Sequence, residues 1–328
     1  MTWFGDVFGF EESSENIDRH ITIDGGHMHS GGNGRTFRSG TLSVPTLDEL
    51  RDEADAVADQ VPGSLRIREV VADAQALHID PANAGALFQV ASQCNLLEMA
   101  SPDATPANGI TIYEYDHTQG PACAIACAAG TLQRNWFAQS TEDQVDTLAA
   151  VGKDLGNRSD HNGYGHFWEM RNGYALLTGA VPDDVPEAHD ELAIGIHADT
   201  EVTLAGAGHT VTQAYCSALP LGYSSVDTDQ VAPLARMVLN SSYEATLAAG
   251  AINAARSGNN TVWLTLVGGG VFHNPITWIV DAIERACNLY ADVDLDIAIV
   301  SYRNSNPALS RLLGYGLALF VVSGFLGF

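Results

Sequence analysis

Residues 261–275 constrain the fold of this chain more than any other stretch. Residues 261–267 (TVWLTLV) are β-branched and apolar and predict a strand, three glycines follow at 268–270, and Pro275 suits the first turn of a helix predicted over 275–289. A strand, a glycine turn and a helix N-terminus together form an anion-binding cradle, because free backbone N–H groups point at a ligand that glycine lets approach. The alternative is a tight strand-to-helix turn without a ligand.

The charge balance excludes one class of partner. The chain of 328 residues carries 40 acidic and 15 basic residues, for a net charge of −25, and Lys153 is its only lysine. Nucleic acids are bound by basic surfaces, so no nucleic acid is expected as a partner.

The cysteines and the two ends of the chain predict an intracellular protein without a metal. Five cysteines, none in a C-x-x-C pair, indicate reduced and buried side chains, and for Cys123 and Cys127 core packing is favoured over metal binding. The first residues lack the basic and apolar regions of a signal peptide, which predicts a cytoplasmic location. The apolar run 312–328 is short for a membrane span and predicts a buried terminal element, with peripheral membrane attachment as the alternative. We expect no cofactor.

Strands and helices alternate from residue 65 onward. Apolar runs predict strands at 65–71, 87–91, 110–115, 192–197, 211–218 and 297–301 besides 261–267, and helices at 122–130, 141–155 and 231–255. This alternation predicts a three-layer α/β/α fold with a mixed, largely parallel central sheet. We divide the chain into an N-terminal extension (1–60), one α/β domain (61–305) with an aromatic insertion at about 156–174, and the apolar tail (306–328).

The N-terminal extension and the aromatic insertion each contain residues that predict local structure. Thr46 and Glu49 form a capping box for a helix that runs to about residue 58, and only residues 41–44 are expected to form a strand in the extension. We expect both segments to pack over the ligand cleft. The aromatic residues of the insertion either line a pocket or anchor a loop, and anchoring is the simpler interpretation.

Three segments, each placed after a predicted strand, together resemble the macrodomain family, whose members bind ADP-ribose and often hydrolyse ADP-ribosyl bonds. Residues 70–74 (VVADA) resemble the motif in which an aspartate, here Asp73, accepts a hydrogen bond from adenine. Residues 119–130 (QGPACAIACAAG) are similar to the first phosphate loop and its helix, and residues 268–272 (GGGVF) to the second phosphate loop, where Phe272 takes the place of a stacking aromatic residue. For Asp73 alone, a solvated turn carboxylate is the alternative.

The resemblance implies a macrodomain-like fold and a ligand held largely by backbone groups. A diphosphate between two glycine turns needs N–H donors rather than lysines, which suits a chain with one lysine. The ligand-binding residues implied are Asp73, Ala74, Gln93, Asn95, Gln119, Gly120, Pro121, Ala122, Gly268, Gly269, Gly270, Val271, Phe272 and Asn274.

The chain departs from the family pattern where the chemistry takes place. Ala122 stands where hydrolytic members carry an acidic residue, and the family's Asn-Ala-Ala-Asn stretch is VASQ at 90–93. Gln93 and Asn95 are alternatives for holding the distal ribose, and Glu98 and Asp116 are the candidate acid–base groups for cleaving a glycosidic bond. In so acidic a chain, Glu98 and Asp116 as exposed loop acids are the alternative.

The predicted function is therefore ADP-ribose binding, with hydrolysis of an ADP-ribosyl linkage on a protein side chain or a small molecule. A non-catalytic reader of ADP-ribose is the alternative. An acid that reaches the distal ribose separates the two.

Overall fold

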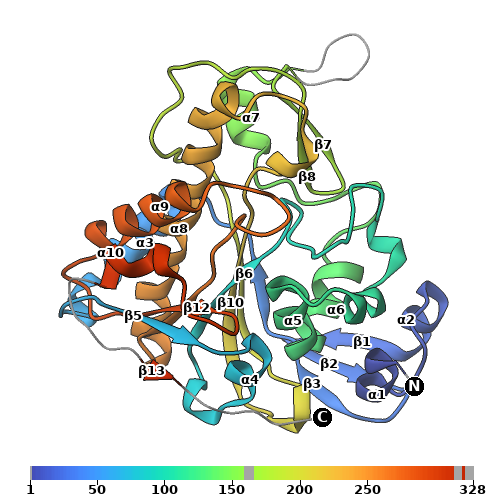
Figure 1. The fold of residues 1–328 in the computed structure, drawn as a ribbon. Helices are drawn as coiled ribbons and strands as arrows, with labels where there is room; N and C mark the ends of the chain where they lie inside the picture. Colours follow the sequence, from blue (N-terminus) through green and yellow to red (C-terminus); the bar gives the residue numbers. More distant parts are fainter. Residues whose placement is uncertain (1, 159–165, 314–319, 322–328) are drawn as a thin grey trace.

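The computed structural model describes residues 2–158, 166–313 and 320–321. The rest of the expected C-terminal element and the middle of the expected insertion lie outside the described residues. A mixed sheet of eight strands forms the centre of the molecule, in the order β13-β5-β12-β11-β6-β10-β9-β4 (Figure 1). Its strands are β4 (Thr41–Ser43), β5 (Arg66–Val71), β6 (Leu87–Ala91), β9 (Gly195–Glu201), β10 (Thr210–Cys216), β11 (Thr261–Leu264), β12 (Asp296–Ser301) and β13 (Phe320–Val321).

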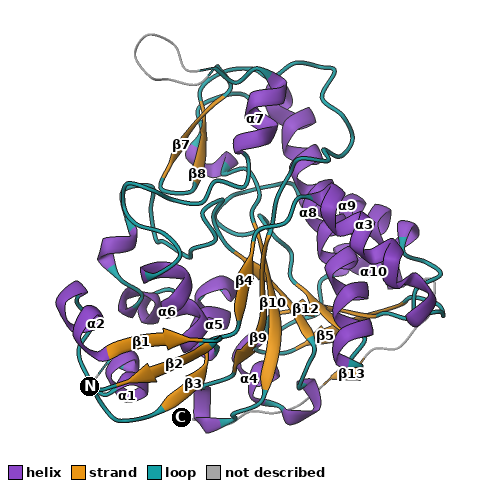
Figure 2. Ribbon diagram, turned by 180° about the vertical axis from the view of Figure 1, so that it is seen from behind, coloured by secondary structure: helices purple, strands orange, loops and turns teal. Residues whose placement is uncertain are grey.

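The strands from β13 to β10 pair in parallel, and β9 and β4 add antiparallel pairs at one edge. Helices cover both faces of this sheet (Figures 1 and 2). On one face lie α3 (Leu47–Val57), α8 (Thr228–Ser257), α9 (Ile276–Leu289) and α10 (Ser310–Leu313), and on the other α4 (Ala74–Ile79), α5 (Gln119–Ala126) and α6 (Ala128–Trp136). The predicted three-layer α/β class with a largely parallel sheet is confirmed.

The long helix α8 is the main packing partner of the sheet. It contacts β6, β10 and β11 on one side, and α3 and α9 on the other, so it is buried nearly all round. Apolar side chains from these elements form the largest core cluster of the described chain. This core holds the strand ends of β6, β10 and β11 in place, and functional loops follow those ends.

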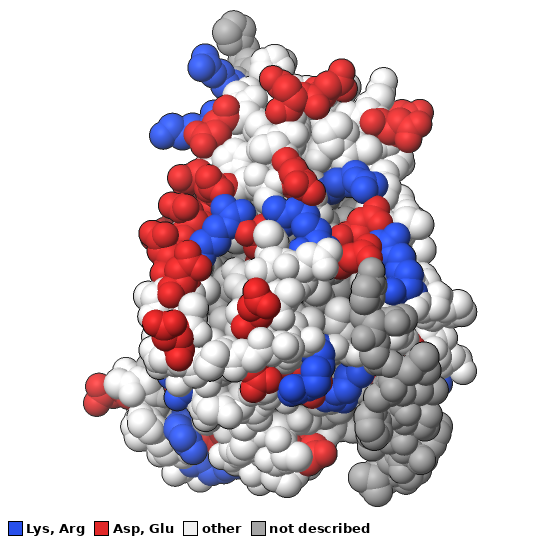
Figure 3. Space-filling model, turned by 90° about the vertical axis from the view of Figure 1, so that its left-hand side faces the viewer, with Lys and Arg blue, Asp and Glu red and all other residues white. Residues whose placement is uncertain are grey.

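Ion pairs link α3, α8, α9 and α10 on the outer surface of the helical layer that these helices form. Glu244 of α8 is buried and pairs with both Arg51 of α3 and Arg285 of α9, while Asp281 of α9 pairs with Arg236 and Arg311. Figure 3 shows this face, where acidic side chains gather with basic ones between them. Arg51, Arg236, Arg285 and Arg311 are therefore engaged with carboxylates.

The N-terminal residues form a separate small sheet that the sequence did not indicate. This sheet contains β1 (Ile21–Asp24), β2 (His27–Ser30) and β3 (Thr36–Arg38), and it lies with α1 (Trp3–Phe8) and α2 (Ser14–His20) beside α6 (Figure 1). The prediction of a single strand in the first 60 residues was wrong. The predicted capping box at Thr46 and Glu49 is present and begins α3.

Other local predictions also need correction. Residues 110–115, predicted as a strand, form a 3-10 helix, η4 (Thr111–Tyr115), and the helix predicted over 141–155 is confined to α7 (Ala149–Leu155). The insertion forms a hairpin of β7 (Trp168–Arg171) and β8 (Tyr174–Leu177) near α7 (Figure 1). No helix in the described part of the chain is both long and apolar enough to cross a membrane.

Candidate functional site

The candidate site is a cleft of about 290 Å³ at the carboxyl ends of the parallel strands. It opens where β11 stops pairing with β6: the two strands pair only at Val262↔Leu87 and Trp263↔Phe88. Open α/β sheets bind ligands at such a divergence. The cleft is lined by Ala91, Ser92, Gln93, Glu98, Met99, Ala100, Asp116, Thr118, Gln119, Gly120, Pro121, Tyr174, Ala218, Tyr223, Thr265, Leu266, Val267, Gly268, Gly270, Val271 and Phe272.

The side chain of Gln119 fills the gap that the diverging strands leave. Its carbonyl oxygen accepts a hydrogen bond from the Ala91 N–H at 2.9 Å, and its amide donates to the Gln89 carbonyl at 2.8 Å. Gln119 thereby satisfies β6 backbone groups that would otherwise face the cleft unpaired. It lines the cleft as predicted, but its amide is already engaged with the strand.

The first glycine loop, which contains Gly120, presents the N-terminus of α5 to the cleft. Thr118 precedes this helix without capping it by its side chain, so the first turn has N–H groups to offer. A Cβ atom on Gly120 would lie 2.1 Å from the Ala91 carbonyl oxygen and 3.1 Å from Cγ of Glu98. Only glycine therefore allows the helix to begin this close to β6.

The side chains of Asn274 and Tyr243 fix the backbone of the second glycine loop, which contains residues 268–270, through hydrogen bonds. The Asn274 amide donates to the carbonyls of Leu219 at 2.9 Å and Gly268 at 3.4 Å, and the Tyr243 hydroxyl donates to the Thr265 carbonyl while it accepts from the Val267 N–H. Asn274 is buried and does not line the cleft. It positions the loop rather than facing a ligand.

The two predicted acids both line the cleft, but they lie in different surroundings. Asp116 follows η4, is partly exposed, and accepts a hydrogen bond from the Thr118 N–H at 2.9 Å. Glu98 is buried, with 1% of its side chain exposed, and both of its oxygens accept hydrogen bonds from Nη2 of Arg134, at 2.8 and 2.9 Å. Glu98 is thus not an exposed loop acid.

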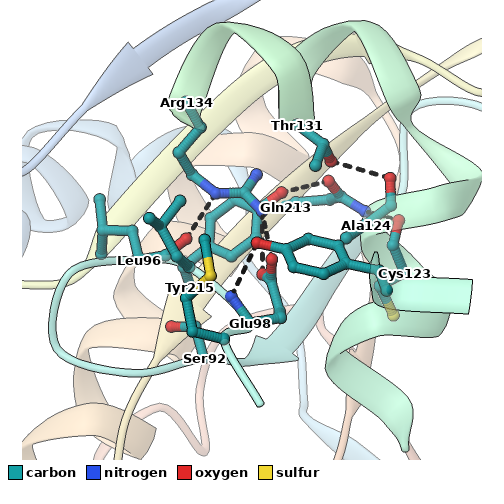
Figure 4. A network of polar contacts seen from close by, with 12 residues as sticks. Ser92, Leu96, Glu98, Cys123, Ala124, Thr131, Arg134, Gln213 and Tyr215 are labelled. Carbon is teal, nitrogen blue, oxygen red and sulfur yellow. Dashed lines mark hydrogen bonds and ion pairs between the residues drawn. The ribbon is translucent and has the colours of Figure 1, made fainter. Parts of the chain in front are cut away.

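Arg134 belongs to a buried polar network beneath the first glycine loop (Figure 4). Its Nε donates to the Leu96 carbonyl, and its guanidinium lies 3.7 Å from the centroid of the Tyr215 ring. Burial raises the pKa of the Glu98 carboxyl to about 7, an effect that the Arg134 charge offsets only in part. The network connects α6, β10 and the loop after β6.

Three aromatic rings form one wall of the cleft. Tyr174 of β8, Tyr223 of η6 (Leu221–Tyr223) and Phe272 of the second glycine loop contact one another, with ring centroids 5.3 to 6.0 Å apart. The Tyr174 hydroxyl donates to the Met99 carbonyl at 2.6 Å. Such a wall suits the flat face of a sugar or a base.

The loop that carries Asp116 is anchored by the N-terminal extension. The carboxylate of Glu12 accepts hydrogen bonds from the N–H groups of Ile110 and Thr111, from the Thr111 hydroxyl, and from the indole N–H of Trp136. No described residue of the extension lines the cleft. The expectation that the extension packs over the cleft therefore finds no support in the lining of the cleft.

The structure brings most of the predicted ligand residues to the cleft and leaves some outside its lining. Asp73 is exposed and caps α4, because its Oδ1 accepts from the N–H groups of Gln75 and Ala76. Asn95 is buried and donates to the Gln144 side chain. The predicted residues outside the lining of the cleft are Asp73, Ala74, Asn95, Ala122, Gly269 and Asn274.

Sequence reasoning missed Tyr174, Tyr223 and Arg134. Tyr174 lies in the aromatic insertion, where the pocket-lining alternative was the better one for this residue. Arg134 gave no clear signal in the sequence, because it stands between the polar residues Gln133 and Asn135. Within the described residues, no group of three or more His, Cys, Asp or Glu side chains is arranged to hold a metal ion.

No protein-family model matches the sequence, and no curated protein matches it. The structure is similar to that of poly(ADP-ribose) glycohydrolase from Deinococcus radiodurans in complex with ADP-ribose, at 14% identity and a TM-score of 0.46, over 84% of this chain and 94% of that one. It is also similar to poly(ADP-ribose) glycohydrolase from Thermomonospora curvata bound to the inhibitor ADP-HPD, at 13% identity and a TM-score of 0.48, over 91% and 95% of the two chains. Likenesses this distant carry no conclusion about the activity of this chain.

Proposed function

We propose that this chain is a divergent member of the macrodomain family that binds ADP-ribose and hydrolyses an ADP-ribosyl linkage. One observation carries the proposal: an accessible acid, Asp116, lines the same cleft as both glycine loops, which contribute Gly120, Gly268 and Gly270. A backbone cradle for a diphosphate and an acid beside it are the two parts that such a hydrolase needs.

The electrostatics of the cleft favour binding through backbone groups. None of the described residues that line it is Lys or Arg. The N-terminus of α5 and the N–H groups of Gly268 and Gly270 therefore hold the diphosphate, while the aromatic wall contacts a ribose. The cleft volume of about 290 Å³ suits the diphosphate and one sugar rather than the whole ligand.

The adenosine part then extends along the sheet edge to α4. Gln75 of α4 donates a hydrogen bond to the Ala122 carbonyl of α5 at 3.4 Å, so the starts of these two helices are adjacent. Asp73 stands at the start of α4, with only Oδ1 used for the cap. Its second oxygen is the acceptor that we assign to the adenine amino group.

Asp116 is the group that we assign to proton transfer. In hydrolysis, water attacks the anomeric carbon of the distal ribose, the bond to the leaving oxygen or nitrogen breaks, and Asp116 removes a proton from the water or donates one to the leaving atom. Glu98 is the weaker candidate for proton transfer, because both of its oxygens accept hydrogen bonds from Arg134.

Two experiments test the proposal. Titration calorimetry with ADP-ribose, AMP and ATP tests binding, and an absence of ADP-ribose binding at millimolar ligand rejects both the enzyme and the reader. Incubation with substrates ADP-ribosylated on different side-chain types, followed by mass spectrometry, tests turnover. Binding of ADP-ribose without its release from any substrate would reject the enzyme and support the alternative, a non-catalytic ADP-ribose-binding protein.

A further inference from the structure

The buried pair of Glu98 and Arg134 lies directly below the proposed diphosphate site. A Cβ on Gly120 would lie 3.1 Å from Cγ of Glu98, so the first glycine loop rests on this side chain. Figure 4 shows the Arg134 guanidinium reaching from α6 to the Glu98 carboxylate. Arg134 is fully buried, and its Nη1 has no hydrogen-bond partner among the described residues.

The pair places a hidden cation under a cradle whose described lining residues include no Lys or Arg. While Glu98 is ionised, it neutralises Arg134, and the floor of the cleft has no net charge. Once Glu98 takes up a proton, it keeps a hydrogen-bonding oxygen for Arg134 but no longer balances its charge. A buried charge without a counter-ion is costly, and an anion bound above Gly120 would supply the counter-ion.

We propose that ADP-ribose binding is coupled to uptake of a proton by Glu98, so that Arg134 becomes the positive charge that supports the diphosphate from below. This inference rests on the proposed function. Arg134 acts through Glu98 and does not touch the ligand, which makes it a positioning residue. The coupling is reciprocal, because a group that protonates more readily when an anion is bound also strengthens the binding of that anion.

The surroundings of the pair leave Glu98 as the group that titrates near neutral pH. The groups that face it are Tyr113 of η4, Tyr215 of β10 and Cys123 of α5, and burial raises the pKa of each well above its usual value, so they stay neutral. His197 of β9 and Cys127 face Arg134. Burial lowers the pKa of His197 to about 3 and raises that of Cys127 far above its usual value, so both are neutral as well. Burial raises the pKa of Glu98 itself to about 7.

The sign of the effect follows from these values. A bound diphosphate raises the pKa of Glu98 further, so binding takes up a fraction of a proton, up to about one half at pH 7. Affinity for ADP-ribose should fall as the pH rises from 6 to 8, by several-fold up to roughly tenfold for a shift of about one pKa unit. The diphosphate of ADP-ribose has no group that titrates in this range.

The experiment is titration calorimetry of ADP-ribose at pH 7 in PIPES and in Tris, two buffers that contain no phosphate and have different heats of ionisation. The wild type should show proton uptake. Glu98→Gln keeps an oxygen for Arg134 without the charge, so it should bind at least as tightly as the wild type, without proton uptake and with little change in affinity between pH 6 and 8.

Glu244→Gln is the matched control, because Glu244 is a second buried carboxylate that pairs with arginines, but it lies on α8 and does not line the cleft. It should retain the proton uptake of the wild type.

Binding with equal heats in both buffers, or uptake that persists in Glu98→Gln, overturns the inference and leaves the proposed function standing. Proton-coupled binding without turnover of any substrate supports the inference and rejects the hydrolase. No binding of ADP-ribose overturns both.

Discussion

The side-chain carbonyl of Gln119 accepts a hydrogen bond from the backbone N–H of Ala91, at 2.9 Å, at the point where β6 parts from β11. A helix side chain thus takes the place of a neighbouring strand. The cleft can open here because its wall has no unpaired backbone groups at Gln89 and Ala91.

Asp116→Asn should lower turnover by about 10²–10⁴-fold, the usual contribution of a general acid–base group, and leave the affinity for ADP-ribose nearly unchanged. Steady-state kinetics on a substrate that the wild type cleaves, together with calorimetry, measures both effects. Glu114→Gln, two residues earlier and outside the lining of the cleft, is the control and should keep wild-type turnover. Wild-type turnover in Asp116→Asn would refute the assignment.

Glu98→Gln should also lower turnover if Glu98 shares in proton transfer, but to a lesser degree than Asp116→Asn, because its oxygens face Arg134. The same variant should not lose affinity for ADP-ribose. A greater loss of turnover in Glu98→Gln than in Asp116→Asn would reverse the order of the two acids.

Gly120→Ala and Gly270→Ala should differ in their effect on stability. The added methyl group on Gly120 meets the Ala91 carbonyl oxygen at 2.1 Å, so the start of α5 must shift, and a cost of roughly 1–3 kcal/mol is expected. A Cβ on Gly270 meets nothing within 4 Å, so stability should hold while the ligand is kept from the backbone. Urea unfolding and calorimetry on both variants test this, and equal stabilities would contradict the geometry.

Asn274→Leu should weaken ADP-ribose binding although its side chain does not line the cleft. The variant loses the hydrogen bonds to the Leu219 and Gly268 carbonyls and leaves them buried, at a cost of roughly 1–3 kcal/mol in unfolding free energy. Asn306→Leu removes a cap on another turn and is the control for binding. Unchanged affinity in Asn274→Leu would show that the loop holds its shape without the side chain.

Stability should fall on acidification because of two buried histidines, His78 and His197, which together outweigh the opposite effect of Glu98. His78 is the one chosen for the test. Its Nδ1–H donates to the Ala74 carbonyl at 2.7 Å, its Nε2 accepts from Gln213, and burial lowers its pKa from 6.5 to about 4. Since the unfolded chain binds the proton more readily, stability present above pH 6.5 is lost as the pH falls towards 4, by about 3 kcal/mol. Glu98 acts in the opposite sense, because stability linked to its raised pKa is present below pH 4.5 and lost as the pH rises through about 7.

Urea unfolding at several pH values between 7.5 and 4.5 measures this loss. His78→Gln should flatten the pH dependence, because the remaining effects of His197 and Glu98 oppose each other. His27→Gln, at an exposed position, should leave the pH dependence as in the wild type. The same slope in all three proteins would exclude His78 as its source.

The overall fold was predictable because its signals are local. The apolar runs of β5, β6 and β12 and the glycines after β11 stand out in a window of a few residues, and strand ends in a parallel sheet meet at one edge. The short polar strands β1 to β3 gave no such pattern, because their pairing depends on packing against α1 and α6.

The candidate site was predictable in its backbone parts and less so in its side chains. Gly120 and Gly268 both line the cleft, and the sequence pointed to them because glycine marks a turn. The partner of Glu98 is Arg134, 36 positions along the chain, and no spacing rule joins a loop acid to a helix arginine at that distance. Gln119 and Asn274 were expected to face a ligand, yet most of their hydrogen-bonding capacity serves the backbone around the cleft.

The contacts of Glu12 bear on the order of events during folding. Its partners, from Ile110 to Trp136, lie 98 to 124 positions further along the chain. Contacts between such distant positions form late, since a long loop must close first. The loop before Asp116 therefore reaches its final shape only after α6 has formed and packed. During refolding, the proposed activity should return after the bulk of the helical signal.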